Sequence, residues 1–324
     1  MVLVGDGFTE QPVRFGPEKR LAGVLCLPKT PDRRGRAVVL ASAGRDFSIG
    51  WARSAVAQAR ALAAQGVASL RFDLGGIGDS RAAPDAPDEI LYSAPMCAEI
   101  RLGVDHLHDL GFRSLGIVGR CSGAWASFTV AVEDERIETL VLVNTFSFLW
   151  DSSQSLADVM RFSQRSVGDL GATLLKRGGL RRLLRGDFDL RGGVRFLFRQ
   201  ANQHLLRPCA PVLGPLTTES RRFHRVHGLF KRLRARDVSV LLAYAEGDSS
   251  LAELRSFMGR DFARLRRYPN ATMLTVPDAD HNFTPERARQ VLVQRLVTFL
   301  DAPPVRRPAT VDTAPEANGY PVVA

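Results

Sequence analysis

One pentapeptide constrains the fold of this chain more than any other stretch. An apolar run, Leu115–Val118, leads into Gly119-Arg120-Cys121-Ser122-Gly123, and the sequence after Gly123 is typical of a helix packed against a sheet. The pattern Gly-x-nucleophile-x-Gly within a strand, turn and helix is that of a nucleophile elbow. Small residues two positions before and two after the nucleophile let the strained turn fit between its neighbours. The sequence therefore predicts a sharp strand-to-helix turn with a reactive side chain at its tip.

The residue at this tip is Cys121 rather than Ser122. If Ser122 were the nucleophile, Arg120 and Ala124 would take the two glycine positions, where the bulky Arg120 would clash. A buried cysteine is more often a small apolar residue than a nucleophile. The strand and helix on either side of Cys121 favour the catalytic interpretation.

Strand and helix patterns alternate along most of the chain. Such alternation indicates an α/β fold with a doubly wound, mostly parallel sheet. The expected strands are residues 20–27 (antiparallel to 13–15), 37–41, 67–72, 115–118, 139–143, 238–244 and 272–276, and the expected helices are 51–65, 94–110, 124–132 and 285–300.

Two segments interrupt the alternation. Residues 146–236 have a helical pattern and carry 18 Lys or Arg against 6 Asp or Glu, so their net charge of +12 exceeds the +10 of the whole chain. Residues 301–324 contain five prolines and no apolar periodicity, which predicts a disordered tail. We therefore expect a core of residues 10–145 and 237–300, a basic helical cap at 146–236 and a Pro-rich tail.

Composition excludes several classes of protein and partner. No apolar run approaches the roughly 18 residues that span a bilayer, and the N-terminus lacks the pattern of a secretory signal. The four cysteines, Cys26, Cys97, Cys121 and Cys209, have no paired spacing, which predicts free thiols in a reducing cytoplasm. No His, Cys or carboxylate pairs stand at ligand spacing, so neither a metal nor another cofactor is expected. No nucleic-acid-binding motif accompanies the basic charge, so nucleic acid is not an expected partner.

A cysteine nucleophile needs a base, and an acid that holds the base in the right tautomer. After an elbow of this type the chain order is nucleophile, acid, base. Asp248 follows the predicted strand 238–244 and His281 follows the predicted strand 272–276, at the sheet edge where open parallel sheets place their active sites. Glu246 is the local rival for the acid role, and the alternative for Asp248 is to cap a helix that begins near Leu251.

Backbone N–H groups are the expected donors to the oxyanion. One is that of Ser122, the residue after the nucleophile, and the second comes from the loop after strand 37–41, where Gly44 and Arg45 are the candidates.

The span from about residue 20 to residue 300 resembles the α/β-hydrolase superfamily. The matching pieces are residues 71–80 (Arg-Phe-Asp-Leu-Gly-Gly-Ile-Gly-Asp-Ser), the elbow, Glu246-Gly247-Asp248 and Ala279-Asp280-His281. The Cys-Ser-Gly-Ala elbow and residues 144–150 (Asn-Thr-Phe-Ser-Phe-Leu-Trp) are similar to bacterial hydrolases of the serine-aminopeptidase-like type, particularly those associated with exosortase or exopolysaccharide systems. The resemblance implies an eight-stranded sheet and a helical cap inserted after the sixth strand. The nucleophile position holds cysteine here, whereas this subgroup has serine. A cysteine at this position is similar to dienelactone hydrolases and polyhydroxyalkanoate synthases. The resemblance to the subgroup is therefore not taken to imply peptidase activity.

A thiol with a reference pKa of roughly 8.5 ionises readily and forms a thioester intermediate. We therefore expect a cytoplasmic hydrolase of esters or thioesters, with amides as a further candidate class, and a small acyl substrate that is anionic or glycan-linked. The alternatives are an acyltransferase acting on an exopolysaccharide or other glycan precursor and a non-catalytic binding protein on the same scaffold. Arg181 and Arg182 in the basic cap are candidate substrate contacts. The other interpretations of that cap are a solvated arginine face and a peripheral contact with an anionic membrane.

Overall fold

The computed structural model describes residues 2–150 and 217–301 of the 324-residue chain. The chain divides into two compact units, one formed by Met1–Trp150 with Leu229–Ala324 and the other by Asp151–Gly228. Every strand of the described part belongs to the first unit. Most of the predicted cap, with Arg181 and Arg182, and nearly all of the predicted tail lie outside the described residues.

The first unit is built on a nine-stranded sheet with the order β1-β2-β3-β5-β4-β6-β7-β8-β9. Strands β5, β4, β6, β7, β8 and β9 run parallel to one another, while the pairs β1–β2, β2–β3 and β3–β5 are antiparallel. The doubly wound, mostly parallel sheet is thus confirmed. The sheet has one strand more than the expected eight, and the additional strand is the two-residue β1. The strands are β1 (Leu3–Val4), β2 (Phe8–Phe15), β3 (Leu21–Pro28), β4 (Arg36–Ala41), β5 (Ala68–Phe72), β6 (Ser114–Arg120), β7 (Ile137–Val143), β8 (Ser239–Ala245) and β9 (Ala271–Val276).

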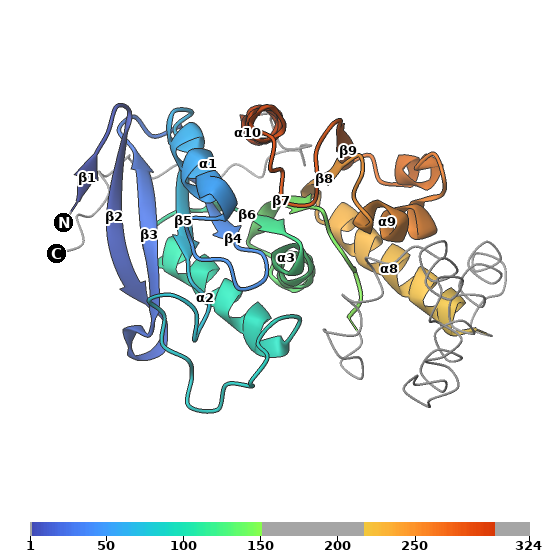
Figure 1. The fold of residues 1–324 in the computed structure, drawn as a ribbon, viewed down its shortest axis with the longest axis horizontal. Coiled ribbons are helices and arrows are strands. Elements are labelled where there is room, and N and C mark those ends of the chain that lie inside the picture. Colours follow the sequence, from blue (N-terminus) through green and yellow to red (C-terminus); the bar gives the residue numbers. More distant parts are fainter. Residues whose placement is uncertain (1, 151–216, 302–324) are drawn as a thin grey trace, which may run out of the picture. The chain divides into compact units, whose positions relative to one another are not determined.

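Helices cover both faces of this sheet. Figure 1 shows α1 and α10 on one face and α2 and α3 on the other. Within residues 2–150 and 217–301 the α-helices are α1 (Ser54–Ala63), α2 (Ala94–Asp109), α3 (Ser122–Glu133), α8 (Thr218–Ala235), α9 (Ser250–Met258) and α10 (Glu286–Asp301). Short 3-10 turns span Pro17–Lys19, Trp51–Arg53 and Ala263–Arg267.

The central strands are buried on both faces because helices pack on each. In β4, Val38 and Leu40 join the core cluster that contains residues of α1 and α10. Val39 points the other way, toward Gly103 of α2. All three side chains are at most 3% exposed. This burial on both faces explains why the sequence of β4 is a continuous apolar run and does not alternate between apolar and polar residues.

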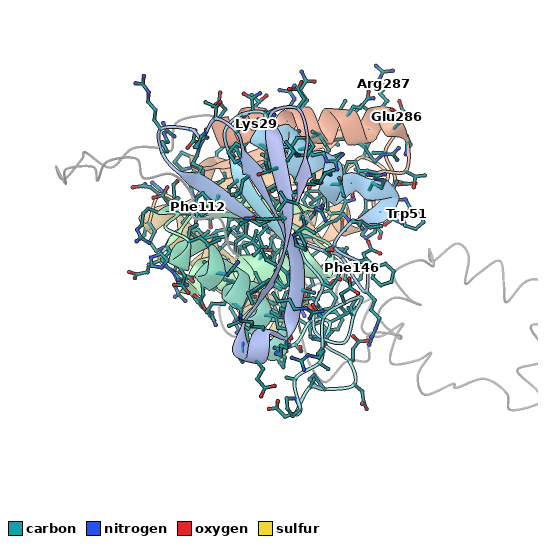
Figure 2. The ribbon with its side chains drawn as sticks, turned by 90° about the vertical axis from the view of Figure 1, so that its left-hand side faces the viewer. Lys29, Trp51, Phe112, Phe146, Glu286 and Arg287 are labelled. Atoms are coloured by element: carbon teal, nitrogen blue, oxygen red, sulfur yellow. The ribbon has the colours of Figure 1, made fainter. Side chains whose placement is uncertain are left out.

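One predicted helix begins later than expected. The sequence predicts a helix over residues 51–65, but the α-helix starts only at Ser54 and a separate 3-10 turn precedes it. Ala52 and Arg53 have φ values of +49° and +61°, which the right-handed helix does not allow. Trp51 is 47% exposed and lies at the right-hand edge of Figure 2.

Candidate active site

The parallel strands all end at one edge of the sheet. Figure 2 makes their direction visible, since Phe112, just before β6, lies on the left and Phe146, just after β7, lies on the right. The loops that leave β4, β6, β7, β8 and β9 therefore gather on the right-hand side of that view. Carboxyl ends of strands at such an edge are where open α/β sheets bind their ligands.

Cys121 occupies the sharp turn between β6 and α3. Its φ of +52° and ψ of −115° fall outside the regions that ordinary side chains prefer. Its backbone N–H donates to the Val143 carbonyl at 2.9 Å, and its carbonyl accepts from Ala124 and Trp125 at the start of α3. The turn is strained, and hydrogen bonds on both sides hold it.

Both glycines of the elbow are sterically required. A Cβ at Gly119 would collide with Ser127 Oγ and the Gly123 carbonyl, and a Cβ at Gly123 would lie 2.7 Å from the Ala41 carbonyl oxygen. Because two of these obstacles are backbone atoms, a larger residue would have to displace β4 or α3. The spacing of the motif is therefore explained by close packing.

Asp248 and His281 meet at the ends of β8 and β9. Nδ1 of His281 and Oδ2 of Asp248 are 2.6 Å apart, and the Asp248 side chain is only 2% exposed. The other carboxylate oxygen, Oδ1, accepts the Ser250 backbone N–H at 2.7 Å at the start of α9. The two roles considered for Asp248, orienting the histidine and capping a helix, are thus filled by its two oxygens. Glu246, the rival, is exposed to solvent.

Cys121 and His281 each shift the pKa of the other. Burial raises the pKa of the Cys121 thiol, but the hydrogen bond and charge of His281, with smaller contributions from Tyr92 and the Ser122 N–H, outweigh it and leave the pKa below its ordinary value. Hydrogen bonds to Asp248 and then to Cys121 raise the pKa of His281 to about 10. Both shifts favour the ion pair of a thiolate and an imidazolium over the pair of neutral groups.

Asp248 is poised to balance that imidazolium. Burial raises the pKa of Asp248, but the hydrogen bonds from His281 and Ser250 outweigh this and lower it overall. The carboxylate is therefore ionised next to the protonated ring.

The other described cysteines behave differently. Burial raises the pKa of Cys26 to about 12 and that of Cys97 to about 11, so both thiols stay protonated near neutral pH. All three described cysteines are free thiols. Cys121 stands apart because it alone among them has its pKa lowered.

The predicted oxyanion loop is tied directly to the elbow. The Gly44 N–H donates to Oγ of Ser122 at 2.8 Å, so this donor already has an acceptor. The Ser122 N–H interacts with the Cys121 thiol. The Arg45 side chain points elsewhere, donating to the Asp88 carbonyl at 3.1 Å.

Three residues at this site were not predicted from the sequence. The Tyr92 hydroxyl lies 3.9 Å from Cys121 Sγ. Asn144 donates from Nδ2 to the backbone carbonyl of His281 at 2.9 Å. Arg120 bridges two loops, since it pairs with Asp46 and donates to Asn282 at 2.8 Å. The sequence signals are the place of Arg120 inside the elbow and that of Asn144 at the start of the segment 144–150, and no pattern singled out Tyr92.

Within residues 2–150 and 217–301, no group of three or more His, Cys, Asp or Glu side chains is arranged to hold a metal ion. None of the helices in these ranges combines the length and apolar character that a bilayer crossing requires.

No protein-family model and no curated protein matches the chain. Solved structures do match. A dienelactone hydrolase from Anabaena variabilis superposes with a TM-score of 0.52 at 13% identity, covering 91% of this chain and 97% of that one. An esterase of Pyrococcus furiosus gives a TM-score of 0.54 at 13% identity over 90% and 92% of the two chains. A proline iminopeptidase of Mycobacterium smegmatis gives 0.50 at 18% identity over 90% and 98%. The sheet order, the elbow and these superpositions together show that the chain has the α/β-hydrolase fold.

Proposed function

We propose that this protein is a hydrolase of esters or thioesters that works through a covalent acyl-enzyme on Cys121, with His281 as base and acid and Asp248 as its orienting carboxylate. The observation that carries the proposal is the pair formed by the Asp248 carboxylate and the His281 ring, 2.6 Å apart, together with a Cys121 thiol whose pKa that ring lowers. A nucleophile, a base and an orienting acid gathered at one site are the arrangement that covalent catalysis needs.

The first half of the reaction forms the acyl-enzyme. The Cys121 thiolate attacks the acyl carbon, a C–S bond forms, and the carbonyl π pair moves onto oxygen. The developing oxyanion is expected to accept from the Ser122 N–H and from the loop that carries Gly44 and Arg45. When the tetrahedral intermediate collapses, the alcohol or thiol leaves with the bond pair and takes a proton from the His281 imidazolium.

The second half releases the acid. Neutral His281 removes a proton from water, the resulting hydroxide attacks the thioester carbon, and the C–S bond breaks to return the thiolate. Asp248 holds Nδ1 of His281 throughout, so that Nε2 serves the sulfur and the water.

The cysteine also supports transfer to another acceptor. A thioester reacts well with amines, thiols and activated alcohols, so acyl transfer to a glycan or similar acceptor competes with hydrolysis. Product analysis with and without an amine or sugar acceptor separates the two reactions. An ester or amide of the acceptor supports transfer, and free acid alone supports hydrolysis.

Intact-mass spectrometry tests the covalent step. The wild-type protein mixed with p-nitrophenyl esters and with acyl thioesters of several chain lengths should gain the acyl mass, and hydroxylamine should remove it. Cys121→Ala should gain nothing, while the matched control Cys97→Ala should behave as wild type. Labelling that persists in Cys121→Ala, or no labelling of the wild type by any substrate, would refute the proposal.

A further inference from the structure

Tyr92 is held close to the proposed nucleophile by an unusual backbone. It lies in the loop between β5 and α2, where its φ is +56°. Bulky side chains rarely adopt this conformation, and such residues concentrate where function requires them. The next residue, Ser93, caps α2 by accepting the Met96 N–H at 3.2 Å, so the strained position is anchored at the start of a 16-residue helix.

Aromatic packing fixes the direction of the Tyr92 ring. The ring stacks on Trp150 with centroids 4.0 Å apart and planes 19° apart, and it packs against Trp125 of α3 at 5.4 Å. Tyr92 is only 6% exposed. Its hydroxyl is therefore directed by packed neighbours rather than by solvent.

The hydroxyl at the end of this ring lies 3.9 Å from Cys121 Sγ. Burial, and then the charge of Cys121, raise the pKa of Tyr92, so the phenol keeps its proton. A thiolate has no proton to give. Toward the ionised form of Cys121, the Tyr92 O–H is therefore the donor and the sulfur is the acceptor.

The oxyanion needs a second hydrogen-bond donor, and the Tyr92 hydroxyl can supply it. Gly44, one of the two expected loop donors, already gives its N–H to Ser122 Oγ. When a thiolate attacks a carbonyl, its negative charge moves from sulfur to the oxygen bonded to the same carbon. A donor that reaches the sulfur before attack is close to that oxygen afterwards.

We propose that Tyr92 is a catalytic residue whose hydroxyl donates first to the Cys121 thiolate and then to the oxyanion of the tetrahedral intermediate. This inference rests on the proposed acyl-transfer function. Tyr92 keeps its proton through both steps and changes only its acceptor. The C–S bond forms from a sulfur lone pair, the π pair moves to oxygen, and the leaving group still takes its proton from His281.

Tyr92→Phe tests the inference, since it removes the hydroxyl and keeps the ring against both tryptophans. Two reactions of Cys121 are compared at a pH where the thiol is fully ionised: acylation by a thioester, which forms an oxyanion, and alkylation by iodoacetamide, which does not. We expect acylation to slow on the order of 10²-fold, as for loss of one oxyanion donor, while the plateau rate of alkylation stays within about twofold of wild type. The pH midpoint of alkylation should rise, because the thiolate loses a donor.

The matched control is Tyr244→Phe, which removes a buried hydroxyl that donates to the Thr145 carbonyl at 3.4 Å. It should change neither reaction. Unchanged acylation in Tyr92→Phe, or an equal loss of acylation and alkylation, would overturn the role assigned to Tyr92. If the wild type forms no acyl adduct at all, the proposed function fails instead, and the alkylation midpoint still reports whether the phenol supports the thiolate.

Discussion

The side-chain amide of Asn144 holds the backbone of His281 in place. Its Nδ2 donates to the His281 carbonyl oxygen at 2.9 Å, and its Oδ1 accepts the Ala245 N–H at 2.8 Å. The Asn144 backbone N–H donates to the Ala243 carbonyl at 2.9 Å. One fully buried side chain thus joins the ends of β7 and β8 to the loop that carries the proposed catalytic base.

Asn144→Ala should therefore impair catalysis more than substrate binding. We expect kcat to fall about 10-fold to 100-fold, because misplaced catalytic groups lose rate steeply, while KM stays nearly constant. The unfolding free energy should fall by about 1–3 kcal/mol, since buried polar groups lose their partners. Steady-state kinetics and urea denaturation measure the two effects.

Asn270→Ala is the matched control for this variant. Asn270 is also buried, and its Nδ2 donates to the Val238 carbonyl at 2.7 Å, at the start of β8 rather than at its end. It should lose stability with little change in kcat. Equal kcat losses in both variants would mean that Asn144 acts only through stability.

Asp248→Asn should disable the base while leaving the fold intact. An amide at this position cannot balance the imidazolium, and it favours the wrong tautomer of His281. We expect kcat/KM to drop by roughly 10² to 10⁴ and the pKa of His281 to fall from about 10. Kinetics and an NMR titration of the ring check both, with Glu246→Gln as the exposed control from the same turn. A similar loss in Glu246→Gln would show that the acid was misassigned.

The acylation rate should follow a bell-shaped pH profile. The Cys121 pKa is lowered, so the thiolate forms, and the rate rises, at a lower pH than for an ordinary thiol. The His281 pKa is raised to about 10, so the rate falls as pH increases through that value and the leaving group loses its proton donor. Both limbs are properties of the coupled pair. Stopped-flow acylation from pH 5 to pH 11 tests this, and a single midpoint near 8.5 would contradict it.

Much of this site could be predicted from the sequence because its parts are local. The elbow depends on close packing around two glycines, and both glycines lie within five consecutive residues, so a short motif reveals the elbow. Asp248 and His281 directly follow apolar strands, and parallel strands bring their carboxyl ends to one edge. Chain order then predicts that Asp248 is the acid and His281 the base.

The residues that were missed depend on contacts between distant parts of the chain. Tyr92 reaches Cys121 across 29 positions, from a residue whose backbone takes a left-handed conformation. Asn144 reaches His281 across 137 positions. No sequence pattern predicts such a contact for a tyrosine in a loop or for an asparagine after a strand. Ala52 and Arg53 also take left-handed conformations before α1, and neither position holds the glycine that usually signals one.

Cys121→Ser tests whether the site activates a thiol better than a hydroxyl nucleophile. A serine hydroxyl stays protonated beside His281, so the pre-formed ion pair is lost and attack must wait for proton transfer. The side chain also recedes from the Tyr92 hydroxyl, which lies at 3.9 Å, a separation suited to a sulfur acceptor. We expect kcat/KM to fall at least about 10²-fold and the acid limb of the pH profile to follow neutral His281 instead of the thiol. Ester hydrolysis by Cys121→Ser at or above the wild-type rate would contradict this, because it would show that the pocket activates an oxygen nucleophile equally well.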